Sequence, residues 1–183
     1  GDDDFQRMVE KIEEQIHIVL VEPNGNLVEQ IKTNYADLAK KHRIQVFVYG
    51  ISTTAGIAKL HLYWNNSELS TLIRRKTIAE NPDGTLDIET ITFSKLCEMI
   101  GTKDIHHLSI DTEGMDYLIL NSIDLSDVKI NEIIFEEWWP VNDDVNGVFE
   151  TGPKVLEIIK EKYKEYSWEK ITLNNMPNYR LTK

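Results

Sequence analysis

The 183-residue sequence contains a single cysteine, Cys97, which excludes an internal disulfide and a disulfide-stapled scaffold. No apolar run approaches the roughly 20 residues of a membrane-spanning helix, and no basic-then-apolar signal opens the chain. Basic residues are scarce, since 20 lysines and arginines oppose 31 acidic residues and leave a net charge of −11. An acidic chain is poorly suited to phosphate backbones and anionic membranes. We therefore expect no nucleic-acid or membrane partner and a cytoplasmic location, while the oligomeric state stays open.

The composition is that of a globular protein with one hydrophobic core, since 41% of the residues are hydrophobic and 28% are charged. Short apolar runs alternate with stretches whose apolar residues recur at helical spacing. This alternation predicts an α/β fold, with a mostly parallel sheet and helices on both faces. The last two apolar runs predict an antiparallel C-terminal hairpin. The runs that predict strands are 16–21, 46–49, 108–111, 133–135, 168–173 and 179–182, and the alternating stretch 57–64 predicts an extra strand.

We expect a single domain over residues 1–183. The polar stretch 65–87 predicts an excursion over the surface, with a short helix near 69–79 and a turn before residue 85. Apolar spacing predicts a helix over 27–42. A second helix over 93–100 should end at Gly101, a residue favoured at helix ends. His106 and His107 are expected just before the third strand, at its end away from any site.

Acidic residues follow three of the four central strands. Glu22 ends the first, Asp111 and Glu113 follow the third, and Glu136 and Glu137 follow the fourth. Ligands of open α/β sheets bind beyond the carboxyl ends of the strands, so this edge is the predicted site. The alternative for any single acid is that it keeps the strand end hydrated or stabilises a nearby helix N-terminus.

Glu22 has the most specific interpretation of these acids. A carboxylate at the end of a buried strand can accept hydrogen bonds from the two hydroxyls of a ribose. The alternative is that Glu22 or Asn24 caps the helix that follows, since asparagine is a favoured cap. The preceding run is clearly a buried strand, so ribose binding is the preferred interpretation.

Four segments together resemble FkbM-type methyltransferases, which use S-adenosylmethionine and have the Rossmann-like class I methyltransferase fold. The segment Ile110-Asp111-Thr112-Glu113-Gly114 is the most specific of them. The resemblance implies a seven-stranded sheet with its last strand antiparallel, and O-methylation of a hydroxyl on a sugar or another small molecule. The four segments are Val21–Asn24, Gly50–Ser52 with Gly56 shortly after, Leu108–Gly114 and Ile133–Glu136.

The resemblance also implies roles for individual residues. Glu22 would hold the ribose with Asn24 beside it, Ile51 and Ser52 would lie near the adenine, and Asp111 would contact the cofactor and line the methyl-transfer site. A hydroxyl acceptor usually needs a base to take its proton as it attacks.

Asp111 is the first candidate for that base, with Glu113 and Glu136 as alternates. These three acids and Glu137 could instead gather a divalent cation. Their spacing matches no dedicated metal loop, so no metal site is predicted.

One departure from the family pattern concerns its first motif, a strand that ends in a glycine-rich turn. The nine glycines contain no Gly-x-Gly. In this fold the missing strand is central, between the strands that end at Glu22 and Asp111. Both neighbours would lose a ladder of buried hydrogen bonds without it. We therefore expect the 183 residues to be part of a longer natural chain.

Two other functions remain open from the sequence. A nicotinamide-dependent oxidoreductase would also place a carboxylate such as Glu22 on a ribose, although it expects a glycine-rich turn and a substrate domain. A degenerate module that keeps the fold would bind a partner or nothing.

Overall fold

The structure, a computed structural model, describes residues 4–63, 70–73, 82–137, 152–173 and 176–183. Its helices are α1 (Asp4–Glu10), η1 (Gly25–Leu27), α2 (Val28–Asn34), η2 (Leu38–Lys40), α3 (Phe93–Ile100), α4 (Asp116–Ser122) and α5 (Gly152–Lys162). Its strands are β1 (His17–Val21), β2 (Arg43–Phe47), β3 (Gly50–Ile51), β4 (Gly56–Leu62), β5 (Gly84–Ile91), β6 (Asp104–Ile110), β7 (Lys129–Glu136), β8 (Ser167–Leu173) and β9 (Met176–Thr182). The chain is therefore mixed α/β, as the sequence predicts.

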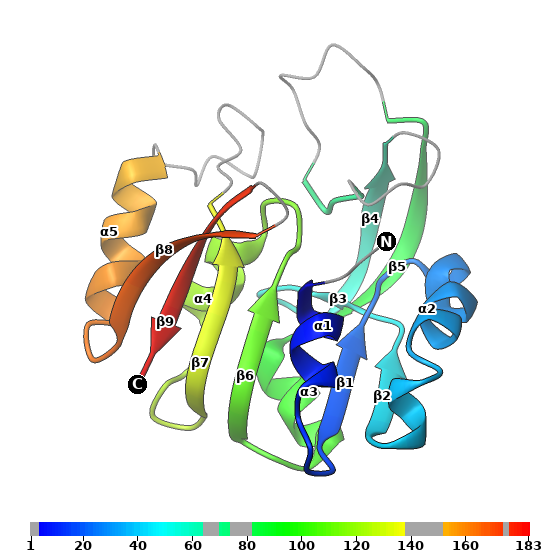
Figure 1. Ribbon diagram of the computed structural model, residues 1–183. Helices are drawn as coiled ribbons and strands as arrows, with labels where there is room; N and C mark the ends of the chain where they lie inside the picture. Colours follow the sequence, from blue (N-terminus) through cyan, green and yellow to red (C-terminus); the bar gives the residue numbers. More distant parts are fainter. Residues whose placement is uncertain (1–3, 64–69, 74–81, 138–151, 174–175) are drawn as a thin grey trace.

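Hydrogen bonds divide the described strands into three sheets rather than one. β1 pairs with β2 in parallel, β6 and β7 are parallel and continue through antiparallel β9 and β8, and β3, β5 and β4 form a third sheet. Figure 1 shows β1, β2, β6 and β7 all pointing toward the same edge. The antiparallel C-terminal hairpin is confirmed. A single continuous sheet is not found among the described residues, because β1 and β6 share no hydrogen-bond ladder.

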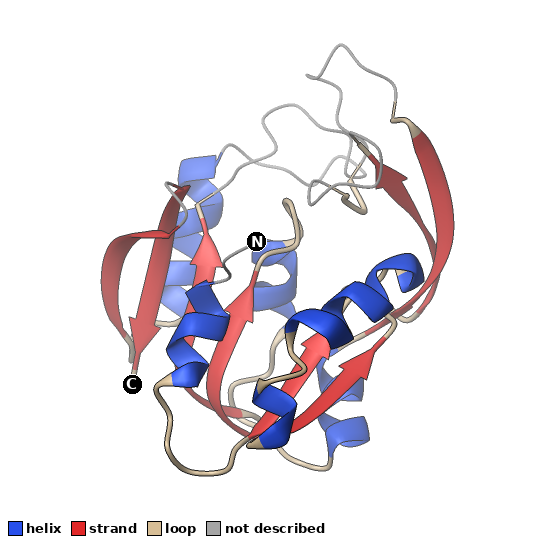
Figure 2. Ribbon diagram, turned by 45° about the vertical axis from the view of Figure 1, so that its right-hand side comes forward, coloured by secondary structure: helices blue, strands red, loops and turns tan. Residues whose placement is uncertain are grey.

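Helices lie on both sides of the strands. Figure 1 shows α1 in front of the region between β6 and β1, with α3 behind that region and α4 behind β7. Figure 2 shows the β4–β5 hairpin extending away from the body of the domain toward the carboxyl edge of the parallel strands. None of the helices in the described part of the chain is long and apolar enough to cross a membrane.

The hydrophobic core is divided into separate clusters of side chains, as the strands are divided into separate sheets. The larger cluster packs under β6, β7 and β9, where Ile133, Phe135 and Leu181 are fully buried. A smaller cluster joins α1 to β1 and the segment after α2, with Val9 and Ile18 at its centre. Apolar side chains drive the burial on each side, and the division between the two clusters follows the separation of β1 from β6.

Helix α3 matches its prediction closely. The Thr92 side chain accepts a hydrogen bond from the Lys95 amide (3.1 Å) and caps the first turn. Gly101 ends the helix with φ of 76°, a left-handed conformation that favours glycine. Cys97 is buried on the inner face, as its apolar neighbours indicate.

The predicted excursion is wrong at its end, because 84–87 begin strand β5. This strand contains no apolar run, because exposed polar residues alternate along it with Leu86 and Ile88, which pack with β4. Thr71 pairs with His61 in an isolated bridge instead of lying in a helix. Most of the predicted 69–79 helix lies outside the described residues.

Two further boundaries differ from the sequence prediction. The predicted 27–42 helix is broken into α2 and the short η2. The apolar spacing continues across the break, because Tyr35 and Leu38 pack into the same cluster, and it therefore predicted a single helix. His106 and His107 lie inside β6 rather than before it. The His107 Nδ1 atom is 2.6 Å from a carboxylate oxygen of Glu132 on the neighbouring strand, so a polar pair sits within the sheet.

Candidate active site at the carboxyl edge

A cavity of about 840 Å³ separates β1 from β6 and reaches the carboxyl edge of both strands. Its volume falls within the range of small-molecule sites. At the carboxyl edge its lining includes Glu22 from the end of β1, Ile51 from β3, and Asp111 and Glu113 from the loop after β6. Side chains from three sheets therefore converge on one space.

Glu22 extends the β1 ladder, since its amide donates to the carbonyl of Phe47 on β2 (3.0 Å). Its Oε1 atom accepts from the amide of Asn24 (2.7 Å). Burial raises the pKa of Glu22, and the hydrogen bond from Asn24 partly opposes that rise. A carboxylate held this way has a fixed orientation beside the cavity.

Asn24 and Ser52 are not among the residues that line the cavity. Asn24 is fully buried, and its side-chain oxygen accepts from the Asn26 amide (3.1 Å), so it caps the turn that opens η1. The Ser52 amide donates to the carbonyl of Ile91 (2.9 Å). Both residues shape the backbone near the site, which agrees with the capping alternative that the sequence left open for Asn24.

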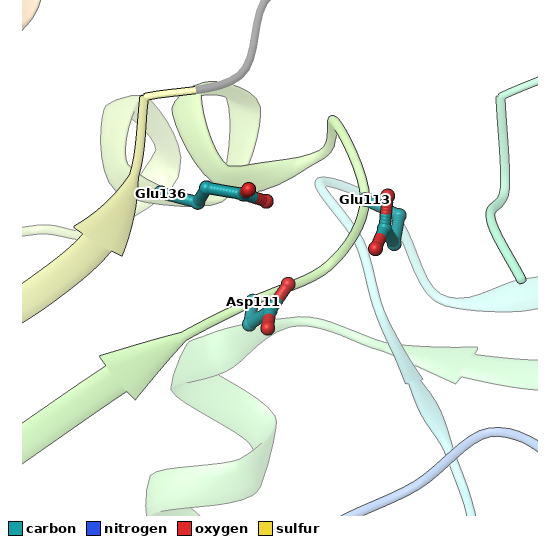
Figure 3. A group of neighbouring side chains, drawn as sticks. All are labelled: Asp111, Glu113 and Glu136. Carbon is teal, nitrogen blue, oxygen red and sulfur yellow. The ribbon is translucent and has the colours of Figure 1, made fainter. Parts of the chain in front are cut away.

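Asp111, Glu113 and Glu136 form a compact group, which we call the acidic cluster. One carboxylate oxygen from each lies within 4.8 Å of the others. Figure 3 shows the three carboxylates facing a common space, with Glu136 arriving from β7 and the other two from the loop after β6. Asp111 is exposed and the two glutamates are half-buried. Three negative charges this close favour a cationic ligand or a transferable proton.

Glu137 does not share that environment. Its carboxylate accepts from the Tyr179 hydroxyl (2.9 Å) and pairs with Lys170, both from the C-terminal hairpin. Burial acts to raise the pKa of Glu137, but the hydrogen bonds from Lys170 and Tyr179 outweigh it and lower the pKa. Glu137 therefore fastens the end of β7 to the hairpin.

The loop between β6 and α4 has an unusual backbone. Glu113 has φ of 53°, and Gly114 follows with φ of 109°. A non-glycine residue in the left-handed region costs about 1 kcal/mol or more, so surrounding contacts must hold it. One such contact is the Thr71 hydroxyl, which donates to the Glu113 carbonyl (2.7 Å). The conformation turns the Glu113 side chain toward Asp111 and Glu136.

Asp116 makes the second set of contacts that hold this loop. The sequence analysis did not predict it as a site residue. Asp116 is only 3% exposed, and its Oδ2 atom accepts from the Thr112 hydroxyl (2.7 Å) and, over longer distances, from the amides of Thr112 and Gly114. The signal available in the sequence was an acid among the apolar residues Met115 and Tyr117. Burial, with a contribution from the charge of Asp111, raises the pKa of Asp116 to about 6.

The raised pKa of Asp116 predicts a specific pH dependence of stability. The protonated acid contributes stability that is present below the ordinary aspartate pKa and is lost as the pH rises through about 6. A shift of this size corresponds to about 3 kcal/mol. We expect the unfolding free energy of the native chain to fall by about that amount relative to Asp116→Asn between pH 4 and pH 7, in urea titrations.

The matched control is Thr85→Ser, an exposed position of β5 whose side chain does not titrate. Its difference from the native chain should stay flat over the same pH range. An equally flat difference for Asp116→Asn would show that the buried carboxyl is ionised throughout.

The cavity lies at the carboxyl edge of parallel strands and is bordered by acids from neighbouring strand ends, and this edge is where open α/β proteins bind small ligands. A family model described as "Methyltransferase FkbM domain" matches residues 1–166, and the chain belongs to this methyltransferase family. The resemblance predicted from the strand-end motifs is thereby confirmed. No curated protein and no solved structure matches the chain.

Proposed function

We propose that the chain is an S-adenosylmethionine-dependent O-methyltransferase with its site at the carboxyl edge of β1 and β6. The observation that carries the proposal is that Glu22 and Asp111, from strands in separate sheets, line one cavity. The acidic cluster lies at the same edge. Membership of the FkbM family favours this function over nicotinamide-dependent oxidation.

The residues present suit an adenosylmethionine ligand. The Glu22 Oε1 atom is already held by one backbone amide, so the carboxylate is preorganised to accept from ribose hydroxyls. Ile51 offers an apolar surface at the same edge for the adenine ring. Asn24 and Ser52 stabilise the backbone next to Glu22 and Ile51, respectively. The negative acidic cluster suits a ligand that carries a positive sulfonium.

When bound, adenosylmethionine supplies a methyl group already activated for displacement, so the protein mainly provides alignment and electrostatics. Asp111 is exposed at the mouth of the cavity and is the proposed base that takes the proton from the acceptor hydroxyl. Glu113 and Glu136 face the same space and raise its negative potential. Asp116 and Thr71 hold the loop that carries two of these acids.

The acceptor in this proposal is a hydroxyl on a sugar or another small molecule. The acidic cluster disfavours a phosphorylated acceptor, because like charges within a few ångströms repel strongly in a partly buried site. A neutral polyhydroxylated molecule can donate hydrogen bonds to the same carboxylates.

Binding of S-adenosylhomocysteine to the natural full-length polypeptide, measured by calorimetry, tests the cofactor assignment. Glu22→Ala should weaken that binding by about 1–3 kcal/mol, because the ribose hydroxyls lose a charged acceptor. Glu29→Ala is the matched control, since Glu29 lies nearby on α2, is exposed, and pairs only with Lys32 among the described residues. Unchanged affinity in Glu22→Ala would remove Glu22 from the site.

The degenerate binding module is the second candidate that the sequence left open. It predicts no heat with adenosylhomocysteine and no methyl transfer to any hydroxylated acceptor. Absence of binding in the natural polypeptide, together with a folded spectrum, would favour that candidate over the enzyme.

A further inference from the structure

The side chain of Thr71 connects the loop after β6 to a segment that is far away in the chain. Its hydroxyl donates to the carbonyl of Glu113 (2.7 Å) and accepts from the amide of Ile73 (3.1 Å). A carbonyl oxygen can only accept, so the direction of the first hydrogen bond is fixed. Thr71 is 1% exposed. Both hydrogen bonds are therefore shielded from water, where the loss of a partner is costly.

The segment around Thr71 is itself anchored by several contacts. The Thr71 backbone exchanges two hydrogen bonds with His61 on β4 (2.8 and 3.0 Å). Ile73 is buried in the larger core cluster, and Leu72 contacts both that cluster and a small one between β4 and β5. The hydroxyl that reaches Glu113 therefore has a fixed position relative to the β3–β5–β4 sheet.

The peptide group between Glu113 and Gly114 is held from both sides. Thr71 donates to its carbonyl, and its amide donates to the Oδ2 atom of Asp116 (3.4 Å). Asp116 lies two residues from Gly114, at the start of α4, whereas Thr71 lies 42 residues from Glu113. Thr71 therefore supplies a long-range restraint, and Asp116 supplies a local one.

This restraint acts on a backbone conformation that is unfavourable for glutamate. The φ of Glu113 is 53°, in the left-handed region. A return to right-handed helical backbone would turn its side chain by roughly 110° about the N–Cα bond. In the conformation observed, Figure 3 shows the Glu113 carboxylate facing those of Asp111 and Glu136, and one oxygen from each lies within 4.8 Å of the others. The acidic cluster therefore depends on the backbone at Glu113.

We propose that Thr71 is a positioning residue for methyl transfer, whose hydroxyl holds Glu113 in the left-handed conformation and so keeps the acidic cluster assembled. Thr71 also lines the cavity, together with Glu113. The β3–β5–β4 sheet thereby sets the geometry of acids that are carried by β7 and the loop after β6. The effect on the reaction rate rests on the proposed function, whereas the effect on the loop does not.

Three variants separate the hydroxyl from the rest of the side chain. Thr71→Val keeps the shape and removes the hydroxyl, while Thr71→Ser keeps the hydroxyl and removes the methyl group. Thr90→Val is the matched control, since Thr90 is 4% exposed on β5 and its hydroxyl bonds to the carbonyls of Thr54 and Gly56 (3.1 and 3.2 Å). This control removes a similarly buried hydroxyl from the same sheet, at hydrogen bonds that do not involve the loop after β6.

Amide hydrogen exchange followed by NMR tests the restraint without any cofactor. The reporter is the buried amide of Gly114, which shares its peptide group with the Glu113 carbonyl. The reference is the amide of Ile119, which donates to the carbonyl of Met115 in the first turn of α4 (3.0 Å). Thr71→Ala, which also lacks the hydroxyl, replaces Thr71→Val if circular dichroism shows that the valine variant does not fold.

We expect Gly114 to exchange roughly 10-fold or more faster in Thr71→Val than in the native protein, because the loop opens more often. Exchange of Gly114 in Thr71→Ser and Thr90→Val, and of Ile119 in all variants, should stay within about 3-fold of native. Native exchange of Gly114 in Thr71→Val would overturn the proposal. Equal acceleration in Thr90→Val, or of Ile119 in Thr71→Val, would overturn it too, because the effect would then be a general loss of stability.

Methyl-transfer kinetics test the consequence for the site. We expect Thr71→Val to lower kcat roughly 10-fold or more, because small displacements of catalytic groups have large effects on rate. The KM for adenosylmethionine should change by less than about 3-fold, since the proposed ribose ligand Glu22 lies at the end of β1, outside this loop. Thr71→Ser should keep most of the native kcat. A loss of kcat in Thr71→Ser or Thr90→Val as large as that in Thr71→Val would contradict the proposal.

A double-mutant cycle with Glu113→Gln distinguishes positioning from a general structural effect. If Thr71 acts through the Glu113 carboxylate, Thr71→Val should lower kcat by less than about 3-fold in a protein that already carries Glu113→Gln. Losses that multiply independently would overturn the proposal. If the native protein transfers no methyl group, the proposed function fails and the rate effect fails with it, while the exchange of Gly114 still decides whether Thr71 holds the loop.

Discussion

Asp111→Asn is expected to lower the turnover of methyl transfer by roughly 10²–10⁴-fold, the usual contribution of a general base. Asparagine keeps the size and a hydrogen-bonding oxygen of the side chain but cannot take a proton. Adenosylhomocysteine affinity should change little, because the proposed role of Asp111 lies mainly in the transfer step. The measurement is the rate of labelled-methyl transfer to whichever acceptor is used best in a panel of sugars and hydroxylated small molecules.

Glu113→Gln and Glu136→Gln separate the base from its neighbours in the acidic cluster. Each is expected to lower turnover less than Asp111→Asn, because these side chains act through the potential of the site and not as the proton acceptor. Asp87→Asn, on exposed β5, should leave turnover unchanged. Wild-type rates in Asp111→Asn would reject it as the base, and a larger loss in one glutamate variant would transfer that role.

Phe135→Ala is expected to lower the free energy of unfolding by about 3–5 kcal/mol, the range for deleting a buried aromatic side chain. Phe135 is fully buried, and its ring contacts those of Tyr117, Trp168 and Tyr179 at centroid distances of 5.7, 6.1 and 5.6 Å. The cavity left by alanine would lie where β7, α4 and the C-terminal hairpin meet. Urea unfolding followed by circular dichroism measures the loss.

Phe135→Leu should cost less than the alanine variant, because leucine fills most of the space. Met176→Ala is the surface control, since Met176 is 45% exposed on the same hairpin and should change stability by less than about 0.5 kcal/mol. A loss below about 1 kcal/mol in Phe135→Ala would mean that the aromatic cluster repacks readily and does not anchor the end of β7.

The acidic residues at the carboxyl edge of the strands could be predicted from the sequence, because the pattern that indicates them lies within short segments. Apolar runs that end on Glu22, Asp111 and Glu136 identify strands and their carboxyl ends together, and parallel strands bring such ends to one edge. The structure places Asp111 and Glu136 in one cluster with Glu113. That Glu22 and Asp111 share a cavity follows from the same rule.

Other features could not be read from the pattern, because their causes lie in contacts between distant segments. The spacing of residues in the sequence does not indicate a role for Asp116, and its burial depends on how α4 packs. The left-handed backbone at Glu113 depends on Thr71, which is 42 residues away in the chain. Strand β5 was concealed because its polar residues face outward, and only its pairing with β4 gives it order.

The sequence by itself determined the family, the order of strands and helices along most of the chain, and the acids at the strand ends, since these depend on residue type and spacing within short segments. Only the tertiary structure decided which edges pair and which acids meet. The physical reason is that strand pairing and burial are properties of two or more segments together. No single segment encodes the partner that satisfies its backbone.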